Sequence, residues 1–193
     1  PPTAAPAQPT AAPAQPTAAP AQPTAAPAVT FPVGVVLPTK AEPRWIQDQT
    51  RFQDAFKKAG YDVQILFSQG DSAKEKANVE ALISQGVKVI IITPQDATAA
   101  AAGAKAAHDA GIKIISYDRL IRDTDAVDYY VTFDSMAVGA AWSDYLISKA
   151  SGKGNNLYLY AGAASDNNAF VFFQGAWSVL QPKIADGTFV IKN

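Results

Sequence analysis

Residues 113–121 read KIISYDRLI, and the fold of the chain is best predicted outward from this stretch. Its first half is a short apolar run rich in β-branched residues, typical of a strand buried on both faces of a parallel sheet. Asp118 and Arg119 follow where such a strand ends, which is where ligands bind in open α/β sheets. A carboxylate beside a guanidinium suits a ligand made of hydroxyl groups, but the same pair also occurs as a surface salt bridge or a turn.

Apolar strands and amphipathic helices alternate at short, regular intervals before this stretch. Strand patterns lie at residues 30–38, 61–67 and 87–93, and helix patterns lie at 45–59, 72–85 and 98–110. Ser72 is the expected N-cap of the second helix, with Glu75 completing a capping box. The order β-α-β-α-β-α-β predicts an α/β fold with a doubly wound parallel sheet.

A second block with the same rhythm follows the stretch. It contains strand patterns at 129–133, 157–160 and 189–191 and helix patterns at 136–149 and 168–180, after a polar loop at 120–128. We expect a complete first lobe over residues 30–120, a partial second lobe over 121–193, and a hinge at 118–128. A lobe with so few strands is small for independent stability, so we expect the chain to be truncated.

Residues 1–29 are a repeat of a different character. The unit PTAAPAQ starts at Pro2, Pro9 and Pro16, and a fourth copy from Pro23 ends in Val29. Two prolines in each repeat exclude a heptad helix. The composition predicts a disordered, extended spacer, which would be either the stalk of a surface-tethered extracellular protein or a linker between domains.

Composition excludes several classes of function. The formal net charge is −1 and no basic cluster is present, which argues against nucleic acid or an anionic membrane surface as partner. The absence of cysteine excludes thiol chemistry and cysteine-based metal sites, and no cofactor or metal motif is found. No apolar run is long enough to span a membrane, so we expect membrane attachment only through an N-terminal lipid anchor outside this sequence. His108 is expected to face water or to stabilise the C-terminus of its helix.

Polar side chains gather at the carboxyl ends of the predicted strands. The candidates are Lys40, Arg44 and Trp45 after the first strand, Asp96 after the third, Asp118 and Arg119 after the fourth, and Asp134, Asp166 and Asn168 in the second block. Together they supply the donors and acceptors that read a polyol, and Trp45 adds a flat apolar face for a sugar ring.

Structural roles remain open for several of these residues. Trp45 could instead pack at the start of its helix, and Asp96 and Asp134 could serve as a turn residue and a helix cap. Asn167 is expected to cap the helix that follows it, and Trp177 is expected to lie in the core.

Three stretches resemble a known family. PTKAEPRW at 38–45, YDRLIRDTDAVDYYVTFD at 117–134 and DNNAFVFFQGAWSVLQP at 166–182 are similar to the periplasmic sugar-binding proteins of the xylose-binding and multiple-sugar-binding virulence protein group, which are type I periplasmic binding proteins of ABC transporters. The similarity covers residues 33–193. The chain departs from the family at 161–165, where it reads AGAAS, and the family chains continue well beyond this one.

The resemblance implies a function and a site. A monosaccharide, either xylose or a sugar like glucose or galactose, would bind between two lobes and be delivered to an ABC transporter permease outside the cytoplasm, without catalysis. The matching positions are Arg44, Trp45, Asp118, Arg119, Asp166 and Asn168. The resemblance also fits a lipoprotein-tethered chain at the cell surface.

Other functions are weighed against this one. A sugar receptor that signals to a membrane kinase or chemoreceptor would share the same site. A glycosidase would have to rest on carboxylates such as Asp118 and Asp166, which are expected to be ionised acceptors and not proton donors. A transcription regulator of the same sensor fold would need a basic helix-turn-helix module, whereas uncharged repeats occupy that place.

Overall fold

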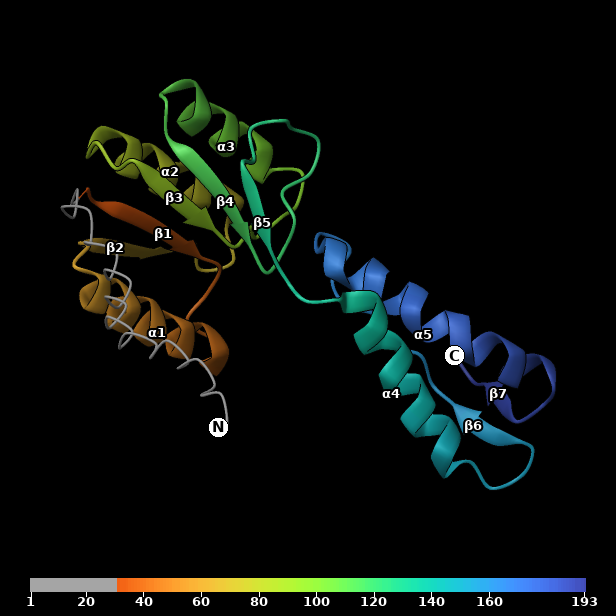
Figure 1. The fold of residues 1–193 in the computed structure, drawn as a ribbon. Coiled ribbons are helices and arrows are strands. Elements are labelled where there is room, and N and C mark those ends of the chain that lie inside the picture. Colours follow the sequence, from red (N-terminus) through yellow and green to blue (C-terminus); the bar gives the residue numbers. More distant parts are fainter. Residues whose placement is uncertain (1–30) are drawn as a thin grey trace, which may run out of the picture.

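The first α/β unit contains a five-stranded parallel sheet. The computed structural model describes residues 31–193, which form two α/β units joined by a short segment (Figure 1). The strand order in the first unit is β2-β1-β3-β4-β5. The strands are β1 (Val33–Leu37), β2 (Val63–Phe67), β3 (Val89–Ile92), β4 (Lys113–Tyr117) and β5 (Tyr129–Val131), and the helices are α1 (Pro43–Ala59), α2 (Ser72–Ser84) and α3 (Ala100–Asp109). The predicted spacer at residues 1–29 lies outside the described residues.

Helices cover both faces of this sheet, as the doubly wound prediction requires. On one face, α1 packs Trp45 against Val35 and Leu37 of β1. On the other face, α2 and α3 pack against the remaining strand residues, with Leu82 and Ala104 fully buried (Figure 1). β1 is buried throughout because it lies inside the sheet under helices on both sides. The fold class predicted from the sequence is therefore confirmed.

Strand β5 belongs to the first sheet and not to the second unit. It pairs with β4, with Val131 opposite Tyr117. The preceding loop is anchored in the first core by Ile121 and Ala126, which are both buried. The prediction that this strand opens the second lobe is therefore wrong, and the loop at 118–128 is not the crossing between the units. The chain leaves the first sheet after Val131 and enters the second unit at Ser135.

The second unit is smaller. It contains α4 (Ser135–Lys149), β6 (Asn155–Leu157), α5 (Asn167–Ala185) and β7 (Phe189–Ile191), with β6 and β7 paired in a two-stranded parallel sheet. The two helices cross at very close range: a Cβ atom on Gly139 would lie 2.1 Å from the carbonyl oxygen of Phe172, and one on Gly175 would lie 2.0 Å from that of Met136. Glycine is required at this crossing because any side chain would push the backbones apart.

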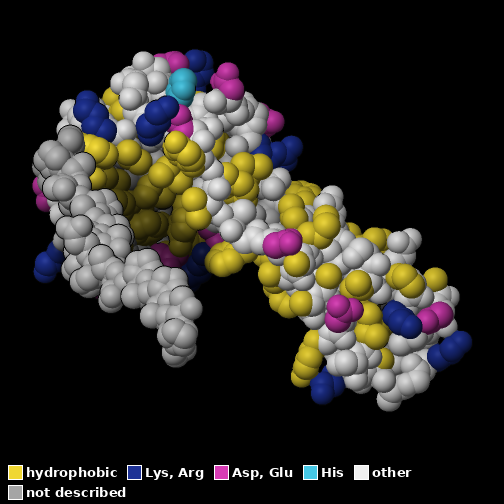
Figure 2. All heavy atoms as spheres, viewed as in Figure 1, with side chains coloured by type: hydrophobic (Ala, Val, Ile, Leu, Met, Phe, Trp, Pro, Cys, Tyr) yellow, Lys and Arg dark blue, Asp and Glu magenta, His cyan; other side chains and the backbone are white. Residues whose placement is uncertain are grey.

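Large apolar side chains remain exposed on the second unit (Figure 2). Trp142 is 54% exposed and Tyr160 is 90% exposed, and both line a surface cavity of about 510 Å³ between the helices and β6. Trp177, which we expected in the core, is only partly buried and stacks on Phe173 with ring centroids 5.6 Å apart. Helical spacing therefore predicted that the rings of Phe173 and Trp177 lie on the same face of α5, but it did not predict how deeply Trp177 is buried.

Two helix starts differ from the predicted ones. The N-cap of α2 is Asp71, whose carboxylate accepts the N–H groups of Ala73 and Lys74. Glu75 is buried and forms no capping box. At α5 the cap is Asp166 and not Asn167, because the Asp166 carboxylate accepts the N–H of Asn168. His108 is exposed in the last turn of α3, as predicted.

No helix within residues 31–193 is long and apolar enough to cross a membrane.

Candidate functional site

Asp118 is the centre of a polar cluster at the carboxyl end of β4. Its backbone lies in the left-handed region, with φ of 64°, and its N–H donates to the carbonyl oxygen of Val131. The Ser116 hydroxyl donates to the Arg119 carbonyl and accepts the N–H of Ile121, which tightens the turn. This local geometry buries Asp118 to 5% exposure. Few residues besides glycine, asparagine and aspartate adopt such a backbone readily.

The Asp118 carboxylate joins the two units. One oxygen, Oδ2, accepts from Arg44 of α1 at 2.5 Å, and the other, Oδ1, accepts from the side-chain amide of Asn168 of α5 at 3.2 Å. Partial burial opposes the charge of Arg44, but the hydrogen bond and charge of Asp118 and the charge of Asp48 together raise the pKa of Arg44 above its ordinary value. The Arg44 side chain remains 43% exposed, so part of its donor set faces solvent.

The backbone carbonyl of Asp118 is a second point of convergence. Its oxygen accepts from the Thr132 hydroxyl at 2.7 Å, from the Asn168 amide at 3.1 Å and from the Tyr130 hydroxyl at 3.2 Å. Burial raises the pKa of Tyr130, so this hydroxyl stays protonated and donates at ordinary pH. Strand β5, the segment that leads from β5 to α4, and helix α5 therefore all donate hydrogen bonds to the carbonyl oxygen of Asp118.

Arg119 forms a second link between the units. Its Nε lies 2.9 Å from the Asp166 carboxylate, and its Nη1 donates to the carbonyl of Pro94 at 3.4 Å. Nearby, the N–H of Ala97 donates to the carbonyl of Ser165 at 2.9 Å. The loop after β3 and the turn before α5 are thus held against each other beside the Asp118 cluster.

Trp45 lies beneath this cluster as a buried platform. It is 1% exposed, and its ring nitrogen donates to Glu42 at 3.1 Å. The guanidinium carbons of Arg44 and Arg119 lie 4.5 Å and 5.5 Å from the centre of its ring. The open aromatic face that the sequence suggested is therefore covered by two arginines, and the alternative of packing at the start of α1 describes its position.

Three predicted site residues lie in other contacts. The Lys40 ammonium is 4.9 Å from the centre of the Phe67 ring on the exposed surface. Asp96 accepts the N–H groups of Thr98 and Ala99 before α3, and Asp134 accepts the N–H of Ala137 at the start of α4. Both carboxylates therefore have the structural roles that were left open for them.

Several members of the cluster were not predicted. Asp48 follows Arg44 by one helical turn and approaches it at 3.6 Å, and Tyr130 and Thr132 share one face of the chain at and after β5. The i,i+4 and i,i+2 spacings are the signals that could have identified them. Phe133 is also close, with its ring centre 5.9 Å from the Arg44 guanidinium, and it is 64% exposed. Phe133 is thus an exposed aromatic ring beside the cluster.

Within residues 31–193, no group of three or more histidine, cysteine, aspartate or glutamate side chains is placed to hold a metal ion.

Comparisons with known proteins agree with this architecture. The family model described as periplasmic binding protein domain matches residues 33–192. The chain is 41% identical over 165 residues to the multiple sugar-binding periplasmic receptor ChvE of Rhizobium radiobacter, covering 83% of this chain and 47% of the receptor. It is 30% identical over 155 residues to the D-xylose-binding periplasmic protein of Escherichia coli, covering 80% of this chain and 46% of that protein. The chain therefore spans about half the length of these curated relatives.

Solved structures show the same likeness. A carbohydrate transporter solute-binding protein from Chloroflexus aurantiacus, in complex with D-glucose, superposes with a TM-score of 0.81 at 76% sequence identity, over 83% of this chain and 47% of that one. An ABC transporter solute-binding protein from Clostridium phytofermentans, with bound β-D-glucose, superposes with a TM-score of 0.78 at 36% identity, over 83% of this chain and 51% of that one. The match of the family model over residues 33–192 shows that the chain belongs to the periplasmic binding protein domain family.

Proposed function

We propose that this protein binds a monosaccharide of the glucose or xylose type at the Asp118 cluster. The observation that carries the proposal is the convergence of Arg44, Asp118, Arg119 and Asn168, from both units, at the carboxyl ends of the strands. The names of the relatives point to the same ligand class, since they are sugar-binding proteins, and two structural neighbours hold glucose.

The cluster retains hydrogen-bonding capacity for a sugar. Each oxygen of the Asp118 carboxylate has one protein donor and keeps a further acceptor site. Arg44 is exposed enough to offer its remaining N–H donors. An acceptor and a donor side by side match two adjacent hydroxyls of a pyranose ring, and the exposed ring of Phe133 suits the apolar face of that ring.

Binding would involve both units. The contacts of Asp118 to Arg44 and Asn168 span the first sheet and α5, so a ligand at this place touches both sides. A sugar that is fully contacted only when the units are close shifts the population toward the closed arrangement. The segment 132–134, which leads from β5 to α4, is our proposed hinge in place of the loop at 118–128.

Delivery to an ABC transporter permease outside the cytoplasm is part of the proposal. Support comes from the relatives, which are named as periplasmic receptors and transporter solute-binding proteins. A lipid-tethered position at the cell surface and a sensory role toward a membrane kinase or chemoreceptor are both compatible with the same site. Co-purification with a permease or with a sensor would distinguish transport from signalling.

A glycosidase is the rival function, and the contacts of the two candidate carboxylates disfavour it. Asp118 is paired with Arg44, and Asp166 is paired with Arg119. A glycosidase needs one carboxyl group that donates a proton to the leaving oxygen, whereas both of these carboxylates lie in ion pairs with guanidinium groups. Incubation with oligosaccharides and chromatography of the products tests this, and hydrolysis that disappears in Asp118→Asn would favour the enzyme.

Calorimetric titration with D-glucose, D-xylose, D-galactose and L-arabinose tests the main proposal. We expect at least one of them to bind and Asp118→Asn to weaken that binding by tenfold or more, in line with the loss of a charged acceptor. Asp109→Asn is the matched control, because Asp109 forms an exposed ion pair with Lys105 on α3. Failure of all four sugars to bind the unaltered protein would contradict the proposal.

A further inference from the structure

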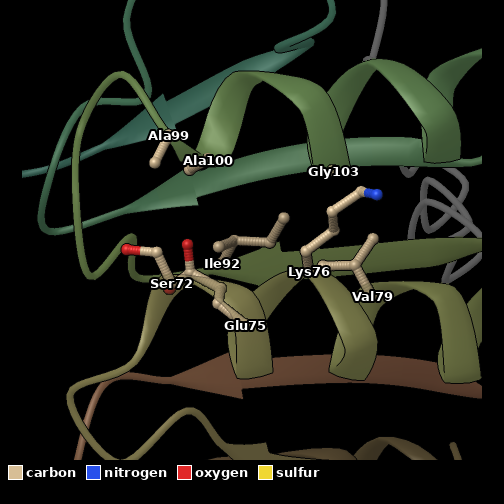
Figure 3. Close-up of a pocket in the computed structure, with 8 residues that line it drawn as sticks. All are labelled: Ser72, Glu75, Lys76, Val79, Ile92, Ala99, Ala100 and Gly103. Carbon is tan, nitrogen blue, oxygen red and sulfur yellow. The ribbon is translucent and has the colours of Figure 1, made fainter.

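Glu75 is a buried carboxyl group without a role in the proposed site. It lies on α2 at 2% exposure and faces the narrow space between α2 and α3, together with Ile92 and Ala100 (Figure 3). Its Oε2 accepts the N–H of Gln95 at 2.7 Å. Its Oε1 is buried and has no hydrogen-bond partner among residues 31–193. An ionised carboxylate is costly in such a place.

The polar and charged groups around Glu75 come from α2 and from the residues that follow three of the strands. Lys76 lies on the same helix as Glu75, Ser68 follows β2, Asp96 follows β3 and Arg119 follows β4. Burial raises the pKa of Glu75 to about 7, although the N–H of Gln95 and the charge of Arg119 act in the opposite direction. The hydroxyls of Ser68 and Thr93 are also buried and lack partners within the described chain.

A short loop connects Glu75 to the proposed sugar site. Gln95, which Glu75 holds, follows Pro94, and the carbonyl of Pro94 accepts from Arg119. Two residues further on, Ala97 bonds to Ser165 of the second unit. The loop at residues 94–97 therefore touches Glu75 on one side, and Arg119 and the turn before α5 on the other.

We propose that Glu75 is a positioning residue for the loop at residues 94–97, and that gain or loss of its proton changes how this loop holds Arg119. The ionised carboxylate strengthens its bond to the Gln95 N–H and attracts the Arg119 guanidinium. The neutral carboxyl weakens both effects.

The consequence for binding rests on the proposed function. A sugar between the units removes water from Arg119, which strengthens the attraction between its guanidinium and the ionised Glu75 carboxylate. Binding is then linked to proton release, so affinity rises as the pH rises from 6 to 8.

The position of Glu75 can be tested without any sugar. In the ligand-free protein, the amide ¹⁵N and ¹H shifts of Gln95 are followed by NMR between pH 5 and pH 9. We expect a titration with a midpoint near 7, its disappearance in Glu75→Gln, and its persistence in Glu80→Gln, which alters an exposed residue on the same helix. Shifts of Gln95 that stay flat in the unaltered protein, or that titrate equally in Glu75→Gln, would overturn the proposal.

The link to the site is tested by glucose affinity at pH 6 and pH 8. We expect severalfold tighter binding at pH 8 in the unaltered protein and in Glu80→Gln, and equal affinity at the two pH values in Glu75→Gln. A protein whose Gln95 amide titrates while its glucose affinity stays constant would overturn the link. If no glucose binds at either pH, the proposed function fails, and the Gln95 titration still decides whether Glu75 positions the loop.

Discussion

The side-chain amide of Asn168 donates to both the carbonyl oxygen and a carboxylate oxygen of Asp118, a residue 50 positions earlier in the chain. Both residues are buried, and they belong to different α/β units. The two units are therefore bonded at the point where the polar cluster forms, and the same bonds that join them also orient the proposed sugar acceptor.

Asn168→Ala should weaken both the protein and its sugar binding. The substitution removes one donor from two buried oxygens of Asp118, which costs about 1–3 kcal/mol when such groups lose a partner. Urea denaturation and sugar titration would measure the two effects. Asn167→Ala is the control, since Asn167 is less buried and did not prove to be the cap of α5. Equal effects of the two substitutions would contradict the role of Asn168.

Asp118→Ala and Asp118→Asn should separate backbone strain from loss of charge. Alanine at a φ of 64° carries a conformational penalty of about 1 kcal/mol, which asparagine largely avoids. We therefore expect both variants to lose sugar affinity, and the alanine variant to melt at a lower temperature. Gln69→Ala serves as the comparison, because Gln69 has a φ of 56° and is exposed. An asparagine variant no more stable than the alanine variant would argue against backbone strain.

Glu75→Gln should stabilise the protein at alkaline pH. The pKa of Glu75 rises from the usual 4.5 to about 7 in the folded state, so its contribution is fully present below pH 4.5 and is lost as the pH rises through 7. Between pH 4.5 and pH 8, the unfolding free energy of the variant should rise relative to that of the unaltered protein, by up to roughly 3 kcal/mol. Urea denaturation at both pH values measures this shift, and a constant difference would contradict it.

Trp45→Ala should destabilise the first unit strongly. The ring is buried in the core beside β1 and supports two guanidinium groups, and large-to-small changes of this kind cost about 3–5 kcal/mol. Trp142→Ala removes the same side chain from an exposed place and should cost far less. Thermal melting of the two variants gives the comparison. Similar decreases in melting temperature for the two variants would mean that burial does not explain the contribution of Trp45 to stability.

Gly139→Ala should disrupt the second unit. The added methyl group would lie 2.1 Å from a backbone oxygen of α5, and helix backbones cannot give way as a flexible side chain can. Gly103→Ala on α3 is the matched control, because its nearest neighbour would be 3.7 Å away and alanine favours a helix by about 1 kcal/mol. Melting curves should move in opposite directions for the two variants. A Gly139→Ala variant that melts at the same temperature as the unaltered protein would contradict the close crossing of α4 and α5.

The sequence predicted the features that depend on local pattern. Apolar periodicity located the strands and helices of the first unit, and the rule for strand ends brought Asp118 and Arg119 to the cluster. It did not predict the partner of β5, because a short apolar run identifies a strand and not its neighbour. The burial of Ile121 and Ala126 decides that pairing, and such packing inside a polar loop has no periodic signal.

The differences within the site have a similar cause. The sequence favoured an open stacking surface for Trp45 over packing at the start of its helix, and the placement of two arginines over its ring supports the second position. Asp71 and Ser72 are adjacent and are both residue types favoured at an N-cap. Only the hydrogen bonds from the N–H groups of Ala73 and Lys74 to the Asp71 carboxylate identify Asp71 as the cap. Glu75 resembled a capping glutamate by spacing, whereas the tertiary structure directs it inward to Gln95.

The carbonyl oxygen of Asp118 is a hydrogen-bond acceptor that no substitution can remove. Tyr130, Thr132 and Asn168 all reach it, and every amino acid at position 118 would still provide that oxygen. Substitution of Asn168 would therefore alter how firmly the two units are bonded, and substitution of Tyr130 or Thr132 would alter how firmly β5 and the connecting segment are held, without moving the oxygen to which all three donate. Ligand preference can then diverge among descendants of this chain while this bonding site stays at the same peptide unit.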